Sequence, residues 1–185
     1  TVPTFLARQP RLLVTAPPAA AGSYVATPAS TFGGPLTDPG FVGATVVAAI
    51  DGGGASPLDG CEAITNGAAV AGNIAYVDRG TCSFVIKVKN CQDAGAVAVV
   101  VANNQAGTLL MGGTDATIVV PAVSISQADG LIIRPNLPVT ADLGLNTLPR
   151  AGTNAAGRVM MYAPSTYSAG SSVSHWDTTA LPNLL

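Results

Sequence analysis

The hydrophobic pattern of the chain predicts short strands separated by turns. Six apolar runs have the length of β-strands: 44–50, 73–77, 96–101, 117–123, 139–143 and 158–162. The third run is continuous and rich in Val, which is typical of a strand buried on both faces. Glycines 52–54 follow the first run without the Lys and Ser/Thr of a phosphate-binding loop, so we interpret them as a flexible turn.

The pattern changes to that of a helix between the second and third runs. Phe84, Val88 and Cys91 recur at i, i+4 and i+7, which places them on one face of a helix over 83–94. Polar side chains, Lys87 among them, fall on the other faces. Together with its two flanking strands, this helix predicts a βαβ unit with a right-handed crossover.

A second, shorter helix is predicted after the fourth run. Residues 126–129 have the form of a capping box, which begins with Ser126 and opens a helix. The apolar pattern continues the helix through Ile133, and Pro135 ends it.

The chain divides into three parts. Residues 1–40 are rich in Pro and Ala, with short apolar runs at 11–15 and 23–27. Because proline cannot donate to a central ladder, we expect edge strands and loops there. Residues 40–162 hold the elements above and form the main domain, and 163–185 are a turn-rich tail. The chain starts without the features of a signal peptide, so we expect a portion of a longer protein.

Composition narrows the function classes. A chain of 185 residues suits one domain of ordinary size. Only 10% of its residues are charged, against about 25% in typical domains. Its eight scattered bases form no stripe for nucleic acid, and no apolar run approaches the roughly 20 residues that cross a bilayer. We therefore expect no nucleic-acid or membrane partner. Abundant Ser, Thr, Asn and Gly with little Lys fit secreted bacterial proteins better than cytosolic ones, so we expect an extracellular bacterial protein and a monomer.

Several segments together resemble the protease-associated (PA) domain family. They are 71–84 with the turn Asp78-Arg79-Gly80, then 87–90, 94–96, 102–104, 118–126 and Asp129-Gly130. The resemblance covers residues 40–145. It implies a β-rich α+β fold: a small open β-barrel or sandwich of about seven to nine strands with two flanking short helices. Members of the family are non-catalytic modules of secreted or vacuolar proteases and of sorting receptors, so the resemblance assigns no catalytic and no cofactor-binding residue.

The tail carries a second resemblance. Residues 170–177, followed by Pro182-Asn183-Leu184, are similar to the third-ligand segment of leishmanolysin-like zinc peptidases. In those metzincins a His-Glu-x-x-His helix supplies the first two ligands, and a Met-turn follows the third histidine. The resemblance implies that His175 is a zinc ligand only in a full-length parent peptidase, with this chain as its PA-like insert. It implies zinc in the parent and no cofactor in this fragment.

His175 has other interpretations. It is the only histidine, so the chain cannot build a His-rich zinc site by itself. Ser174 and Asp177 are close in sequence, but neighbours in sequence rarely form a catalytic triad, and no nucleophile elbow surrounds the serine. A plain surface histidine remains the alternative to the displaced zinc ligand.

Three cysteines permit one intrachain disulfide. Cys61 and Cys82 flank a loop whose closure would stabilise the fold by about 3 kcal/mol. Cys91 lies on the apolar helix face, where a thiol acts as a small buried hydrophobe. Three connectivities are open, and we favour Cys61–Cys82. The spacing is unsuited to a cysteine zinc site.

Acids in Gly-rich loops are candidate calcium ligands: Asp38, Asp51, Asp59, Glu62 and Asp115. No Asp-x-Asp-x-Asp-Gly loop is present, so we favour solvated turn acids. For Arg79 we favour a turn-stabilising role over recognition. The loops 51–60 and 103–115 are polar and the expected contact surface. The candidate contact residues are Asp51, Asp59, Arg79, Asn103, Asn104 and Asp115.

Three functions remain under comparison. We favour a non-catalytic interaction or regulatory module of an extracellular zinc protease, whose partner is protein substrate or the parent catalytic domain. The alternative is a free-standing extracellular adhesion or sorting-receptor-type domain. A self-contained hydrolase is the least favoured, because no acid–base or nucleophile constellation is evident.

Overall fold

A computed structural model describes residues 10–145 together with two short strands, Ala163–Pro164 (β9) and Ser174–His175 (β10). Residues 10–145 belong to one compact unit, and β9 and β10, which pair antiparallel, belong to another. The strand expected at 158–162 lies outside the described residues. No helix in the described part of the chain is long and apolar enough to cross a membrane.

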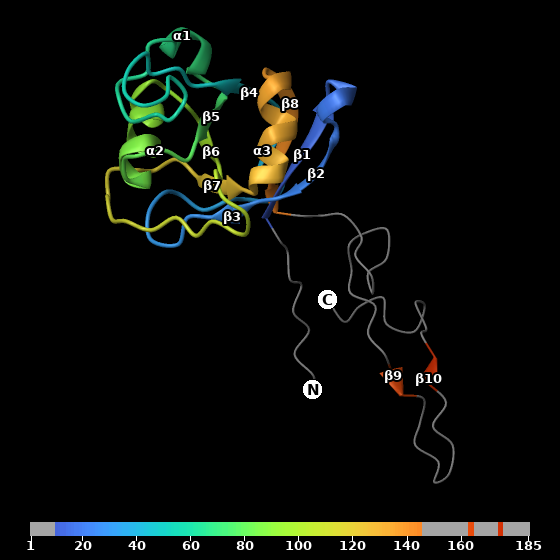
Figure 1. Cartoon of the computed structure of the whole chain (residues 1–185). Helices are drawn as coiled ribbons and strands as arrows, with labels where there is room; N and C mark the ends of the chain where they lie inside the picture. Colours follow the sequence, from blue (N-terminus) through green and yellow to red (C-terminus); the bar gives the residue numbers. More distant parts are fainter. Residues whose placement is uncertain (1–9, 146–162, 165–173, 176–185) are drawn as a thin grey trace. The chain divides into compact units, whose positions relative to one another are not determined.

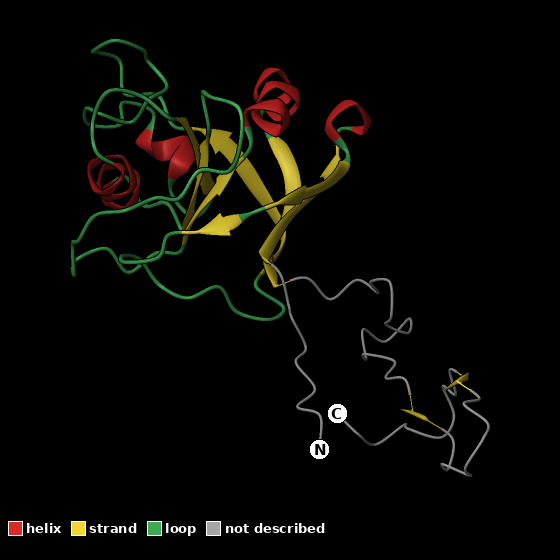
Figure 2. Cartoon of the chain, turned by 60° about the horizontal axis from the view of Figure 1, so that its bottom comes forward, coloured by secondary structure: helices red, strands yellow, loops and turns green. Residues whose placement is uncertain are grey.

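The main unit is built on one eight-stranded sheet that curls into a nearly closed barrel (Figure 2). Its strands are β1 (Pro10–Ala16), β2 (Gly22–Val25), β3 (Thr27–Pro28), β4 (Phe41–Ala48), β5 (Ile74–Asp78), β6 (Ala98–Ala102), β7 (Ala122–Ile125) and β8 (Val139–Leu145). Their order is β2-β1-β8-β4-β5-β6-β7-β3. The two ends of this order, β2 and β3, are separated in sequence only by Ala26, and this brings the sheet edges together. The β-rich α+β barrel expected from the sequence is confirmed.

The predicted βαβ unit is confirmed. Helix α2 (Phe84–Asp93) connects β5 to β6, and the two strands run parallel (Figure 1). Strands β4 and β7 extend the parallel part of the sheet on either side. Asp78 pairs with Ala102 at the last position of both strands, so β5 and β6 end at the same edge. This edge is where the candidate site lies.

Alternation along β5 separates two apolar cores. Ile74 and Tyr76 point into the barrel, whereas Ala75 and Val77 belong to the cluster beneath α2. All four side chains are fully buried, as expected for a parallel strand covered on both faces.

Helix α2 buries one side chain that the pattern placed off its apolar face, that of Lys87. Val88 and Cys91 are buried under α2 as expected, but Lys87 is also completely buried. Its ammonium donates to the backbone oxygen of Asp59 and contacts Sγ of Cys61. The loop after β4, which carries Asp59 and Cys61, covers this turn of the helix.

The prediction of edge strands at the N-terminus holds for β2 and is wrong for 11–15. Strand β1 lies between β2 and β8 and pairs with both. Pro10 and Pro17 flank the central part of this strand and do not interrupt its ladder, so Leu12 and Val14 are buried at its centre.

The run 117–123 forms less strand than predicted. Only β7, from Ala122, joins the sheet; ahead of it the Oε1 atom of Gln92 accepts hydrogen bonds from the amides of Val119 and Val120. A side chain from α2 thus replaces a strand partner. The short helix α1 (Gly67–Val70) is an element that the sequence did not predict.

Helix α3 (Gln127–Ile133) begins where the capping box places it. The Ser126 side chain accepts a hydrogen bond from the Asp129 amide at 3.1 Å. Pro135 lies in a 3-10 turn, η2 (Arg134–Asn136), that continues from the helix. A second 3-10 turn, η1 (Pro18–Ala20), follows β1.

Candidate functional site

A cleft of about 260 Å³ opens at the carboxyl ends of β5 and β6. Asp78 and Arg79 reach it from the end of β5, and Asn103 and Asn104 from the end of β6. Helix α3 and the turn after it contribute the opposite wall, including Arg134. Ligands of open α/β sheets commonly bind outside the carboxyl ends of parallel strands, so this position is that of a candidate site.

An ion pair connects the two sides of the cleft. Arg134 Nη1 lies 2.9 Å from Asp78 Oδ2. Burial raises the pKa of Asp78, and the neighbouring guanidinium of Arg134 opposes that rise. The Tyr76 hydroxyl beneath donates to the Gly130 carbonyl oxygen at 3.3 Å, and its pKa is raised mainly by burial. The Asp78–Arg134 ion pair therefore lies above the buried hydroxyl of Tyr76.

Arg79 connects the two loops of the cleft. Its Nη1 donates to Asn103 Oδ1 at 3.0 Å and to Gln105 Oε1 at 3.3 Å, and its carbonyl accepts from Asn104 Nδ2 at 3.1 Å. The favoured turn-stabilising role is thus visible in the contacts. Arginine carries five N–H donors. Among the described residues the hydrogen-bond partners of this guanidinium bind Nη1 alone.

The predicted disulfide is present between Cys61 and Cys82, whose Cα atoms are 5.6 Å apart. It joins the loop after β4 to the residues that precede α2. Cys91 is free and completely buried, as predicted, and burial raises the pKa of its thiol to about 12. A thiol with so high a pKa is a poor nucleophile at neutral pH.

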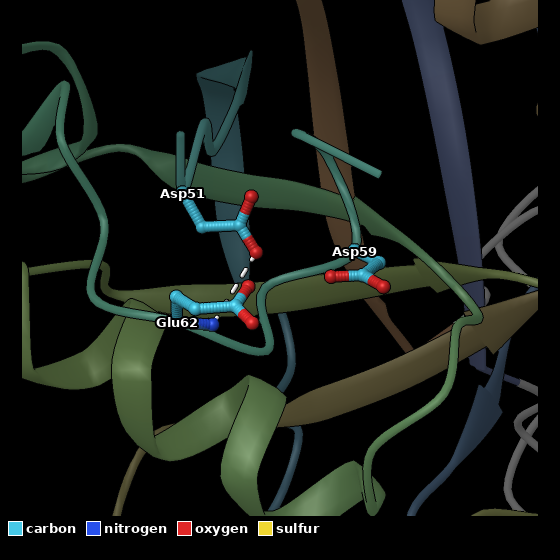
Figure 3. A group of neighbouring side chains, drawn as sticks. All are labelled: Asp51, Asp59 and Glu62. Atoms are coloured by element: carbon cyan, nitrogen blue, oxygen red, sulfur yellow. Dashed lines mark hydrogen bonds between the residues drawn. The ribbon is translucent and has the colours of Figure 1, made fainter. Parts of the chain in front are cut away.

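A cluster of three carboxylates (Figure 3) lies beside the disulfide, because the amide of Cys61 donates to two of them. Asp51, Asp59 and Glu62 each place an oxygen within 4.8 Å of the others. The interpretation as solvated turn acids is wrong for Asp51 and Asp59, which are 3% and 1% exposed. Glu62 is exposed, and the pKa of its carboxyl is raised, by desolvation first and then by a hydrogen bond to Asp51 and the neighbouring negative charges.

The structure brings four of the predicted contact residues to one cleft: Asp59, Arg79, Asn103 and Asn104. Two of these, Asp59 and Asn103, are buried in its walls and present little surface. Asp51 lies in the carboxylate cluster. Asp115 lies on another loop, where it accepts hydrogen bonds from the amide and hydroxyl of Thr117.

Two residues of the cleft were not predicted from the sequence, and the side chain of one predicted site residue lies outside the described part of the chain. Asp78 and Arg134 belong to the cleft and were not predicted. The signal for Asp78 was its place directly after a buried run, where a parallel strand presents its carboxyl end. Arg134 carried no comparable signal. The side chain of His175, the predicted zinc ligand of a parent protein, lies outside the described residues.

Comparison with known proteins finds a family match over much of the chain. Residues 42–133 match the family model described as "PA domain". A curated rice protein, receptor homology region, transmembrane domain- and RING domain-containing protein 1 of Oryza sativa subsp. japonica, is 40% identical over 84 residues. That match covers 43% of this chain and 16% of the rice protein.

Two solved aminopeptidases contain a similar fold. The aminopeptidase from Aneurinibacillus sp. strain AM-1 is 26% identical with a TM-score of 0.54, and covers 74% of this chain. BSAP, a zinc aminopeptidase from Bacillus subtilis, is 22% identical with a TM-score of 0.54, and covers 75%. The similar region is 30% of each aminopeptidase chain. The chain therefore spans only a small part of the proteins that it matches.

Proposed function

We propose, from the premise that residues 42–133 of this chain are a PA domain, that the chain is a non-catalytic module of a larger extracellular zinc peptidase. Its role would be to bind protein substrate or to control its access to the catalytic domain. The observation that carries this proposal is the cleft at the carboxyl ends of β5 and β6, with the Arg79 guanidinium, whose hydrogen-bond partners among the described residues bind Nη1 alone.

The chemistry of the cleft suits recognition of an extended peptide segment. Arg79 would donate from Nε and Nη2 to a carbonyl or carboxylate oxygen of the peptide. Next to Arg79, the carboxylate of Asp78 is paired with Arg134 from the opposite side of the cleft, so this pair carries no net formal charge. Asn104 is exposed at the rim, and its neighbours are fixed by the rigid ends of two strands.

The peptidase setting is supported by the aminopeptidase from Aneurinibacillus, of which a region similar to this chain is one part. The finer prediction of a leishmanolysin-like parent depends on residues 170–177 and remains a prediction, because the matches reported above are to aminopeptidases and a RING-domain protein. In either parent the zinc would belong to the catalytic domain. His175 would join it only in a leishmanolysin-like parent.

A receptor-type module is the second candidate. It is favoured by the rice protein, whose name includes a receptor homology region and which is 40% identical over 84 residues. The residues that flank this chain in its full-length protein distinguish the two. A His-Glu-x-x-His helix upstream and a Met-turn downstream indicate a metzincin, whereas a hydrophobic span of about 20 residues downstream indicates a membrane-anchored receptor.

Binding measurements on the 185-residue chain test the proposed contact surface. We expect immobilised chain to bind unfolded, reduced casein, and Arg79→Gln to weaken that binding at least about tenfold because it removes a charged donor from the cleft. Lys89→Gln removes a positive charge from the exposed side of α2 and is the matched control, with unchanged binding expected. Equal weakening by both variants, or casein binding that neither variant affects, contradicts a peptide site in this cleft.

A further inference from the structure

The carboxylate cluster lies within one loop, between β4 and α1. Asp51 follows β4, Asp59 precedes the disulfide, and Glu62 comes directly after Cys61. The Cys61 amide donates to Asp51 Oδ2 at 2.9 Å and to Asp59 Oδ1 at 3.2 Å, and this brings the two aspartates to the same side of the loop. Figure 3 shows that each of the three carboxylates turns one oxygen toward the other two.

Two buried carboxylate oxygens in this cluster have no hydrogen-bond partner among the described residues. They are Asp51 Oδ1 and Asp59 Oδ2. The side chains that carry them are 3% and 1% exposed, so water does not surround them as it would on the surface. An ionised oxygen without a donor loses the solvation that it has in water, which costs several kcal/mol unless a cation or a donor replaces it.

Lys87 supplies only part of the compensating charge. Its ammonium is directed to the Asp59 backbone oxygen and to Cys61 Sγ, and it makes no hydrogen bond to a carboxylate oxygen of the cluster. Three carboxylates and one ammonium leave a formal charge of −2 when all are ionised. A divalent cation balances that charge.

The geometry points to a site for a hard divalent cation, Ca²⁺, held by Asp51, Asp59 and Glu62, and we propose this as a binding site of the domain. Ca²⁺ binds oxygen at about 2.4 Å, so two of its ligands lie no more than about 4.8 Å apart. The three carboxylates meet that limit without rearrangement. Donors that are all oxygen suit Ca²⁺ and exclude a preference for the softer zinc or copper.

Access and coordination number are also consistent with Ca²⁺. Glu62 is exposed and lies at the entrance, whereas the two aspartates form the floor. Gly54, between Asp51 and Asp59 in sequence, lies directly against the third carboxylate: a Cβ placed on it would come within 2.6 Å of Glu62 Oε1. Water completes the six to eight ligands that Ca²⁺ takes, which is possible only because the entrance is open to solvent.

Such a cation would fix the conformation of the loop between β4 and α1, from which all three ligands come. The same loop is held to the residues before α2 by the disulfide and to α2 by the Lys87 ammonium, so the cation would add to an existing attachment. The site is separate in function from peptide recognition by Arg79, although Asp59 also lines the cleft. Its test therefore uses the metal alone.

Isothermal titration of CaCl₂ into the EDTA-treated 185-residue chain measures the site directly. We expect one Ca²⁺ per chain with a Kd of about 0.1–1 mM, the range of extracellular calcium modules. Ca²⁺ at about ten times Kd should raise the Tm by about 3 °C. Glu62→Gln preserves the shape of an exposed side chain and should weaken binding at least about tenfold.

Asp93→Asn is the matched control. Asp93 is an exposed acid on α2, outside the cluster, and its replacement should leave Ca²⁺ affinity unchanged. Asp59→Asn, if the far-UV spectrum shows it folded, should abolish binding. The proposal is wrong if no saturable heat appears up to about 10 mM Ca²⁺, if Glu62→Gln binds as tightly as the original chain, or if NaCl of equal ionic strength reproduces the whole rise in Tm.

Discussion

Removal of the disulfide should lower the stability of the domain by about 3 kcal/mol. Cys61 and Cys82 are 21 residues apart in sequence, and in the chain-entropy model closure of a loop of that length contributes about 3 kcal/mol at 25 °C. Cys61→Ser opens the loop while a hydroxyl keeps an acceptor near the Lys87 ammonium, which contacts Sγ at 3.2 Å. The change therefore isolates the cross-link from the polar contacts around it.

Thermal unfolding followed by circular dichroism measures the effect. For a unit of this size a loss of about 3 kcal/mol corresponds to a fall in Tm of about 10 °C. A reductant should lower the Tm of the original chain by a similar amount and leave that of Cys61→Ser unchanged, since the variant has no bond to reduce.

Cys91→Ala is the control, because its free thiol is buried and unbridged. That variant should lose only the packing of one sulfur atom, about 1 kcal/mol, and it should respond to reductant as the original chain does. A Cys61→Ser variant that melts within about 2 °C of the original chain would refute the loop-entropy reasoning. A Cys91→Ala variant that no longer responds to reductant would refute the pairing itself.

Three further predictions concern the free thiol, the helix cap and catalysis. Burial raises the pKa of Cys91 from 9.0 to about 12. Because the thiol of the unfolded chain ionises at lower pH than that of the folded chain, the free energy of unfolding should decline from pH 9 to about 12. Urea unfolding across that range should show a smaller decline for Cys91→Ala. Ser126→Ala removes the cap of α3 and should cost about 1 kcal/mol in the same assay, whereas Ser83→Ala, at a helix start without a side-chain cap, should cost less. The chain alone should neither hydrolyse casein nor bind stoichiometric zinc, as measured by gel assay and elemental analysis; hydrolysis that survives repurification and is lost in His175→Ala would contradict this.

The sequence by itself determined the elements whose cause is local. The Val-rich run at β6 is buried on both faces because every one of its side chains is apolar or small. Ser126 begins α3 because its hydroxyl reaches an amide three residues away. Helix α2 has its expected apolar face, although periodicity alone could not reveal that Lys87 is covered as well.

Only the tertiary structure decided the features that depend on distant partners. Strand β1 is central because Leu12 pairs with Tyr24 of β2 on one side and with Leu143 of β8 on the other. The prolines near the N-terminus give no sign of the pairing with β8, which is more than 120 residues away in sequence. Asp78 and Arg134 meet because α3 packs over the end of β5, and no pattern in either segment encodes that contact. The burial of Asp51 and Asp59 has the same origin: a Gly-rich loop appears solvated in sequence, and the fold encloses its acids against the disulfide and Lys87.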